Sequence, residues 1–492
     1  MPYLRAWRRK LAARGRLAAT VTAAGVIVSM VAVSCTTAAP PSAATPAAHA
    51  SGSQAAPGAQ LWVSRYDGPA GTGAWPAAVA ASPDGSAVFV TGWSRDHNAP
   101  ADYVTVGYDS ATGGQLWARR YSGPGKSFDV AAGIVVSPDG RIVFVTGTSA
   151  GVTSGEDYAT IAYSASRGQQ LWLSRYDGPH GFAYAKALVV SQDGKTVFVT
   201  GYSLWGYTTI AYNAATGARR WLSRFKGQAY RNSQARNIAI SPDGKTLYVT
   251  GQSGTTFHHD YLTVAYNAAT GATRWFTRYN GRANRNDYAN TVVVAPGGKT
   301  VYVTGGSTGR SSGTDFATVA YNAATGAQRW AARYNGPGNA LDAGGSLAIT
   351  PNGRTVIVAG PSLGPNSGPG SLTGYATVAY NAATGAPVWT RRTLGFPGIH
   401  PLNSQTPAIS PDSSTVYVTG NNAGNCCDYD YATVAYAIAT GTQQWLSRYN
   451  GPGNKSDQAS ALALSPDGST LYVTGVSDRV SSGGFATIAY QT

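Results

Sequence analysis

The stretch Ala320-Tyr321-Asn322-Ala323-Ala324-Thr325-Gly326-Ala327-Gln328-Arg329-Trp330 occurs in seven related copies and decides the fold. Strand-forming residues lead to the Tyr, Asn-Ala-Ala-Thr-Gly is rich in turn formers, and a second strand opens at the Trp. The closing tryptophan recurs every 49 to 59 residues. The copies stand at Trp117, Trp172, Trp221, Trp275, Trp330, Trp389 and Trp445. A period of this size is typical of a propeller or another repeat array.

Each period contains four short segments that read as strands, for example 275–279, 288–294, 301–304 and 316–321. A second turn motif, Ser241-Pro242-Asp243-Gly244, has Pro early and Gly late, as a tight turn requires. Its seven equivalents begin at Ser82, Ser137, Ser191, Ala295, Thr350, Ser410 and Ser465. Eight periods of four strands predict an all-β, eight-bladed β-propeller of four-stranded antiparallel blades.

The two ends of the repeat region predict that the ring closes on itself. The chain stops at residue 492, halfway through the repeated stretch, and residues 58–62 supply the missing half with Trp62. We therefore expect the segment 61–66 to pair with 485–490 in the last blade. Closure of this kind leaves no open sheet edge between the first and last blades.

The repeated stretch is similar to Ala-x-Asp-x-x-Thr-Gly-x-x-x-Trp, the tryptophan-docking motif of the quinoprotein (PQQ)-like β-propellers. Asp109 keeps the motif's Asp, and Asn replaces it at Asn213, Asn267, Asn322 and Asn381. The Tyr-Val-Thr-Gly segments at 248–251, 302–305 and 472–475 also resemble the bacterial β-propeller (YVTN/WD40-like) repeat. The resemblance covers residues 58–492. It implies that the eight tryptophans, Trp62 included, dock between neighbouring blades, but it implies no particular reaction.

The N-terminal region has the form of an export signal, predicted over residues 1–35. Six basic residues and no acid lie in residues 1–16, and an uncharged stretch follows from Leu17 to Cys35. Ala32-Val33-Ser34-Cys35 resembles a relaxed lipoprotein box, which would lipidate Cys35, and Ala48-His49-Ala50 offers ordinary cleavage. We favour the lipoprotein, with secretion or a retained signal anchor as alternatives. Residues 36–57, rich in Ala, Pro, Ser and Thr, are predicted to be a tether before the propeller at 58–492.

Charge and composition argue against a nucleic-acid partner. Beyond the N-terminal region, 31 basic residues face 22 acidic ones, a net charge of +9. One arginine recurs in each tryptophan strand, and the acids that open the preceding strand are its expected partners. The arginines are Arg65, Arg120, Arg175, Arg224, Arg278, Arg333, Arg391 or Arg392, and Arg448; the acids are Asp102, Asp157, Asp260, Asp315 and Asp430. Arginines spread around a ring favour structural ion pairs over a nucleic-acid patch.

Antiparallel blades sort their loops onto two faces, and the long, variable loops form the face where we expect a ligand. Five histidines fall on this long-loop face: His97, His180, His258, His259 and His400. They come from different blades, and their spacing matches no strong metal motif, so we expect no metal site. Arg231, Arg282 and Arg285 belong to a basic patch on the loops of neighbouring blades.

Four aspartates recur near the start of the innermost strand, at Asp129, Asp287, Asp342 and Asp457. Two interpretations apply. The favoured one is an Asp that caps a turn; the other is a partial acidic ring at the mouth of the propeller channel, which would hold a cation or polar ligand.

Cys426-Cys427 is a candidate disulfide in a variable loop. Quinone-dependent methanol dehydrogenases have an adjacent-cysteine disulfide over their cofactor, but Glu156 is the only glutamate here and it belongs to another blade. We therefore expect a loop staple and no cofactor, with PQQ and calcium as the alternative. No nucleophile elbow or phosphate loop is present, so no catalytic residue is assigned.

Together these features predict an exported, surface-anchored, monomeric binding scaffold rather than an enzyme. Its expected partner is a protein, glycan or cell-wall polymer held by the long-loop face, and the N-terminal lipid or signal anchor is its only membrane contact. The alternatives are a divergent quinoprotein-like oxidoreductase or polysaccharide-acting enzyme, and a structural surface protein.

Overall fold

A computed structural model describes residues 55–96, 100–153, 155–227, 233–255, 258–364, 372–397, 407–423, 429–478 and 483–492. The chain divides into two units, Met1–Gln54 and Ala55–Thr492. The second unit contains eight four-stranded antiparallel sheets, which confirms the predicted eight-bladed propeller. Among the described residues, no helix is long and apolar enough to cross a membrane.

The first four blades follow one another along the chain. Blade 1 is β2 (Ala74–Ala81), β3 (Ala87–Ser94), β4 (Asp102–Asp109) and β5 (Gln115–Tyr121). Blade 2 is β6 (Asp129–Val136), β7 (Ile142–Gly151), β8 (Gly155–Ser164) and β9 (Gln170–Asp177). Blade 3 is β10 (Ala183–Val190), β11 (Thr196–Ser203), β12 (Gly206–Asn213) and β13 (Arg219–Phe225). Blade 4 is β14 (Gln234–Ile240), β15 (Thr246–Gly254), β16 (His259–Asn267) and β17 (Thr273–Tyr279).

The last four blades repeat this order, except that the eighth takes its outer strand from the start of the ring. Blade 5 is β18 (Asp287–Val294), β19 (Thr300–Thr308), β20 (Thr314–Asn322) and β21 (Gln328–Tyr334). Blade 6 is β22 (Ser346–Ile349), β23 (Thr355–Leu363), β24 (Leu372–Asn381) and β25 (Pro387–Pro397). Blade 7 is β26 (Ala408–Ile409), β27 (Thr415–Ala423), β28 (Tyr429–Ala437) and β29 (Gln443–Tyr449). Blade 8 is β30 (Asp457–Leu464), β31 (Thr470–Asp478), β32 (Gly483–Gln491) and β1 (Gln60–Tyr66). Two 3-10 turns, η1 (Pro69–Gly71) and η2 (Pro179–Gly181), precede β2 and β10.

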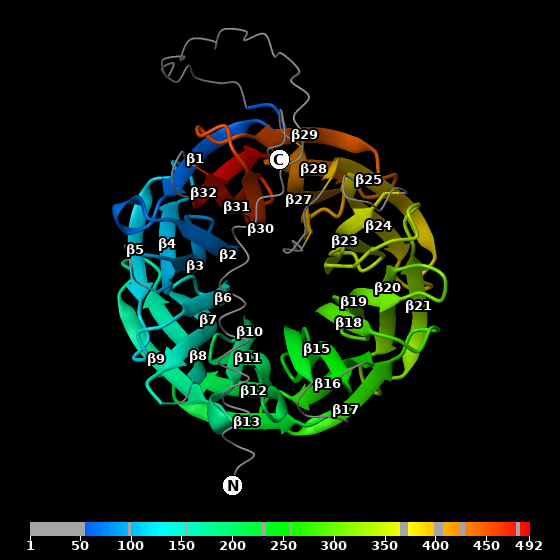
Figure 1. Ribbon diagram of the computed structural model, residues 1–492, viewed down its shortest axis with the longest axis horizontal. Coiled ribbons are helices and arrows are strands. Elements are labelled where there is room, and N and C mark those ends of the chain that lie inside the picture. The colour runs from blue at the N-terminus through cyan, green and yellow to red at the C-terminus, as the bar shows by residue number, and fades with distance from the viewer. Residues whose placement is uncertain are drawn as a thin grey trace, which may run out of the picture. The chain divides into compact units, whose positions relative to one another are not determined.

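The predicted ring closure is confirmed by the pairing of β1 with β32. Trp62 lies opposite Ala489 and Tyr66 opposite Phe485, in an antiparallel register. Figure 1 shows the eight blades around a common axis, with β2, β6, β10, β18 and β30 on the inside and β5, β9, β13 and β21 on the rim. The second and third strands of each blade are almost wholly buried, because neighbouring blades cover both of their faces.

The turn inside the repeated stretch is fixed by its Asn and its Gly. The Asn322 Oδ1 accepts the backbone N–H groups of Ala324 and Thr325 at 2.9 and 3.2 Å. Gly326 has a φ of 73° and donates its N–H to the Asn322 carbonyl at 2.8 Å. A left-handed residue at this point favours glycine, so the sequence specifies the turn locally.

The repeated tryptophans join each blade to the next. Trp117 of blade 1 lies against Gly168 of blade 2, whose added Cβ would come within 2.5 Å of the indole. The Trp117 Nε1 donates to the Ala165 carbonyl at 2.7 Å. The same bond, at 2.7 to 3.0 Å, is made by Trp62, Trp172, Trp221, Trp275, Trp330 and Trp389. Each contact buries a large ring and satisfies its one polar atom, which fixes neighbouring blades relative to one another.

The recurring arginines form most of the predicted ion pairs. Within single blades, Arg120 pairs with Asp102, Arg175 with Asp157 and Arg333 with Asp315 at 2.6 to 2.8 Å. Arg278 and Asp260 lie 3.9 Å apart. These pairs join the third and fourth strands of a blade at their long-loop end, so these arginines are structural.

Candidate functional site

The two faces of the ring differ in the way that the sequence predicts. Both tight turns of each blade lie together, since the Ala323 N–H after β20 donates to the Lys299 carbonyl before β19 at 3.1 Å. This short-turn face repeats from blade to blade. The connections between second and third strands, and between blades, lie at the other end and vary in length and composition, so the long-loop face offers the more distinctive surface.

The four recurring aspartates hold loops within this face. Asp129, Asp287, Asp342 and Asp457 are fully buried. Each accepts a backbone N–H from the glycine six residues earlier, at 2.6 to 2.7 Å. Burial raises the pKa of all four carboxyl groups. Their carboxylates therefore cap the loop that enters each blade, as in the favoured sequence interpretation, and do not present an exposed acidic ring.

The described histidines do not converge. His180 lies in η2 before blade 3 with a φ of 61°, whereas His259 opens β16 in blade 4 and His258 directly precedes it. The His259 Nδ1 is 3.3 Å from the Asn286 Oδ1, and its ring centroid is 5.5 Å from that of Tyr288. No group of three potential metal ligands gathers among the residues that the structure describes.

Two arginines of the predicted basic patch belong to the described residues. Arg282 and Arg285 lie exposed in the connection between blades 4 and 5, and the Arg282 carbonyl accepts a bond from the Arg310 Nε at 3.0 Å. The remaining predicted site residues, Arg231, His97, His400, Cys35, Cys426 and Cys427, lie outside the described residues.

Two stacked aromatic pairs on the long-loop face were missed by the sequence analysis. In blade 1, Trp75 of β2 faces Trp93 of β3, with ring centroids 4.0 Å apart and planes at 13°. The Arg95 guanidinium lies 5.7 and 5.3 Å from the two ring centroids. All three side chains are partly or fully exposed. A cation held over stacked indoles is a preorganised, amphipathic surface.

Blade 3 repeats this arrangement with tyrosines. Tyr184 of β10 faces Tyr202 of β11 at the same cross-strand position, with centroids 5.1 Å apart and planes at 21°. The Lys186 Nζ lies 5.8 Å from the Tyr202 centroid. The signal in the sequence is an aromatic at the second residue of the innermost strand and at the seventh residue of the next. It is recognisable only once the register of the two strands is known.

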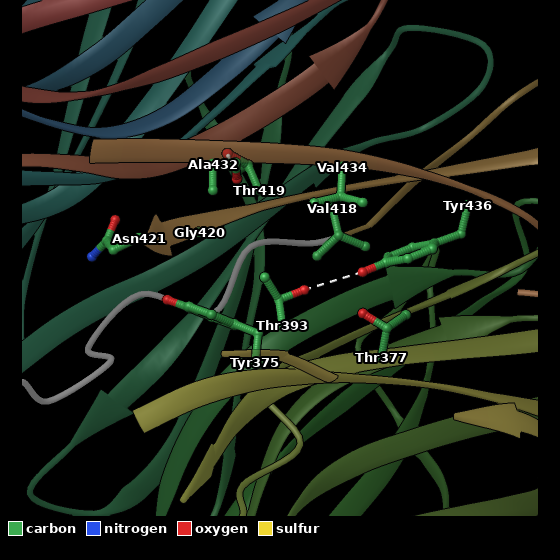
Figure 2. A pocket seen from close by; sticks show the side chains of 10 residues that line it. All are labelled: Tyr375, Thr377, Thr393, Val418, Thr419, Gly420, Asn421, Ala432, Val434 and Tyr436. Atoms are coloured by element: carbon green, nitrogen blue, oxygen red, sulfur yellow. Dashed lines mark hydrogen bonds between the residues drawn. The ribbon is translucent and has the colours of Figure 1, made fainter. Parts of the chain in front are cut away.

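A small cavity lies between blades 6 and 7, as Figure 2 shows. Thr393 of β25 stands opposite Tyr375, at a position where the other seven blades place a Tyr or Phe. The Thr393 Oγ1 lies 3.1 Å from the Tyr436 hydroxyl, and burial raises the pKa of Tyr375 to about 12. The cavity of about 20 Å³ has room for about one water molecule, so it is a packing gap and not a ligand pocket.

A larger hollow of about 420 Å³ lies on the short-turn face between blades 4 and 5. Its walls include Pro242 and Asp243 of one recurring turn, Pro296 of the next, and Arg274. Because the same turns recur around the ring, this hollow offers less specificity than the aromatic pairs of the long-loop face.

Comparison with known proteins agrees with this architecture. The family model described as outer membrane protein assembly factor BamB matches residues 100–364 and 317–484. The comparison with curated proteins gave no match.

Three similar solved structures illustrate how widely this fold is used. Sqt1 of Chaetomium thermophilum bound to the N-terminus of ribosomal protein L10 is 11% identical, with 87% of this chain and 98% of that chain covered and a TM-score of 0.55. A europium-containing methanol dehydrogenase is 14% identical, with coverages of 87% and 85% and a TM-score of 0.53. Dihydro-heme d1 dehydrogenase NirN is 16% identical, with coverages of 84% and 72% and a TM-score of 0.53.

At these identities the structural similarities show the fold alone, because unrelated activities share propellers. The family model carries more weight, since its matches span most of the ring. The chain therefore belongs to the PQQ-like β-propeller family described as outer membrane protein assembly factor BamB.

Proposed function

We propose that this protein is an exported binding scaffold that holds a glycan or cell-wall polymer on its long-loop face. The observation that supports this function is the pair of stacked aromatic platforms, Trp75–Trp93 and Tyr184–Tyr202, each with a cation beside it. Partly exposed aromatics grouped on one face mark interaction surfaces in soluble proteins.

The chemistry of these platforms suits a carbohydrate. Sugar rings present apolar C–H faces, which pack on aromatic rings, and hydroxyl groups, which accept bonds from Arg95 or Lys186. Both platforms are cross-strand pairs within rigid sheets, so little conformational entropy is lost when a ligand binds. A long polymer could contact both blades at once and gain affinity from the two sites together.

An envelope location is part of this proposal. The basic and apolar N-terminal region supports export, and membership in a family described as an outer membrane assembly factor is consistent with it. Lipidation at Cys35 would retain the scaffold at the membrane. A Cys35→Ala variant is then expected in the culture medium; retention of the variant in the membrane fraction would argue for a signal anchor.

The ligand proposal is tested with the full chain and two probes, isolated cell-wall sacculi and soluble neutral glucans. Trp75→Ala/Trp93→Ala should weaken binding at least about tenfold, because each lost aromatic contact is worth about 1 kcal/mol. Phe276→Ala is the control, since it removes a 56% exposed aromatic from the outer strand β17. Equal binding by all three proteins would refute the aromatic platform. Capture of a protein partner with no polysaccharide binding would favour the protein alternative.

A further inference from the structure

A β-bulge recurs at one position of the innermost strand. In blades 1 to 5 and in blade 8, the register with the second strand shifts after the second or third residue of the innermost strand. The extra residues are Ala77, Ala132, Lys186, Arg236, Asn290 and Ser460. A bulge turns its extra side chain out of the ladder, and in these blades it does so on the strand nearest the ring axis (Figure 1).

Three consecutive blades replace the small bulged residue with a long or polar one. Lys186, Arg236 and Asn290 stand on β10, β14 and β18, and each of these strands packs against the next. The position therefore concentrates two cations and an amide on one sector of the inner wall.

The Arg236 guanidinium is held in place by neutral groups. Its Nη1 donates to the Asn290 Oδ1 at 3.2 Å, and its Nη2 donates to the Gln252 Oε1 at 3.3 Å. The Asn290 Nδ2 in turn donates to the Gly344 carbonyl at 3.0 Å. These amides orient the guanidinium without neutralising its charge.

Lys186 adds a second positive charge beside it. Desolvation lowers the pKa of Lys186, and the positive charge of Arg236 lowers it further. Burial raises the pKa of Tyr184, and the negative charge of Glu156 raises it further, so this carboxylate is the acid that faces the tyrosine pair. Within the described ranges, the ion pairs involve arginines of the outer strands, and none includes Lys186 or Arg236. Two like charges thus remain close together, an arrangement that a bound anion would stabilise.

We propose that Lys186 and Arg236 form an anion site on the inner wall that binds a carboxylate or phosphate group of an acidic glycan. The inference rests on the proposed function and extends it, because it assigns a charge to the ligand. The acidic group would lie between blades 3 and 4, and the adjoining sugar would contact the Tyr184–Tyr202 pair. Arginine suits this role because its planar donors can bind two oxygens of one anion.

The test uses the full chain and three polymers: polygalacturonate as the carboxylate probe, poly(glycerol phosphate) as the phosphate probe, and neutral dextran. The variant is Lys186→Gln/Arg236→Gln. Its matched control is Lys195→Gln/Lys245→Gln, which removes the same charge from exposed lysines of blades 3 and 4 at the short turns. We expect the first variant to bind at least one polyanion at least about tenfold more weakly, with a shallower salt dependence, and the control to change less than about twofold.

The probe that loses affinity identifies the anion as carboxylate or phosphate. Equal losses in both double variants, or no polyanion binding by the wild-type chain, would overturn the anion site. If Trp75→Ala/Trp93→Ala weakens binding while Lys186→Gln/Arg236→Gln does not, the glycan scaffold stands and the anion site fails. If Lys186→Gln/Arg236→Gln weakens binding while Trp75→Ala/Trp93→Ala does not, the anion site stands and the tryptophan platform is refuted.

Discussion

At the residue scale, each docking tryptophan contributes two separable interactions. In Trp117, the ring packs on Gly168 and the Nε1 satisfies the buried Ala165 carbonyl. Trp117→Phe should keep most of the packing but leave that carbonyl unpaired, at a cost of about 1–2 kcal/mol. Trp117→Ala should cost about 3–5 kcal/mol through the cavity it creates. Urea unfolding measures the loss of unfolding free energy in both variants. The control is Val152→Ala, which truncates a side chain that is 73% exposed and should change the unfolding free energy by less than about 0.5 kcal/mol. Equal losses for Phe and Ala would show that packing contributes little.

The buried aspartates give a residue-scale prediction with a defined sign. Burial raises the pKa of Asp287 in the folded protein above its unfolded value. The folded state therefore binds this proton more tightly, and the contribution of Asp287 to stability falls as pH rises through its folded pKa. Asp287→Asn keeps an oxygen for the Gly281 N–H, so its stability relative to wild type should improve from about pH 4 to about pH 7.

Asp243 supplies the control of opposite sign for this measurement. Bonds from Ser241 and from the Lys245 N–H lower the pKa of Asp243, so its contribution is present at neutral pH and is lost as pH falls through its folded pKa. Asp243→Asn should therefore be more destabilising at about pH 7 than at acid pH. Parallel pH dependence in the two variants would contradict the role assigned to burial at Asp287.

At the element scale, the contact between blades 6 and 7 lacks a ring that the other blades place at the same position of the outer strand. Thr393 occupies the position of Tyr279 in blade 4, where Tyr279 packs on Tyr261 with centroids 5.2 Å apart. Tyr279→Thr should reproduce the cavity and cost about 3 kcal/mol. Thr393→Tyr should fill it and raise the melting temperature, because the added ring gains contacts that outweigh the lost Thr393–Tyr436 bond. A lower melting temperature for Thr393→Tyr would mean that the blades have closed around the threonine.

The elements themselves could largely be predicted, because their signals are local. The turn at Asn322 to Gly326 and the alternation along the strands depend on residues adjacent in the chain, and the strands extend up to four residues beyond their predicted bounds. The recurring arginines and acids were also recognisable, because their spacing within a blade is constant. The bulge at Lys186 was not predicted, because it is defined by its pairing with another strand.

At the scale of the whole molecule, the candidate site depends on contacts between blades, which no local pattern reports. Lys186 and Arg236 are 50 residues apart in the chain, yet their strands pack side by side. Of the described histidines, His180 precedes blade 3 and His259 opens the third strand of blade 4. Conversely, the buried position of Asp129 follows from the loop folding back over the strand, which a recurring Asp alone does not reveal. A repeated sequence therefore predicts the ring well, and the exceptions to the repeat are the places to look for function.

Closure of the ring by β1 is expected to contribute to global stability, because it joins the first and last blades. Strand β1 supplies the outer edge of blade 8 and places Trp62 against Gly113 of blade 1. A chain that starts at residue 67 loses both contacts, and burial of Trp62 alone is worth about 5 kcal/mol before opposing terms. We expect such a chain to melt far below the wild type and over a broader range, because blades 1 and 8 would separate. A chain that starts at residue 55 retains β1 and should melt as the wild type does. Identical melting of the two truncated chains would show that the ring is held by the remaining blade contacts, without the strand that joins its ends.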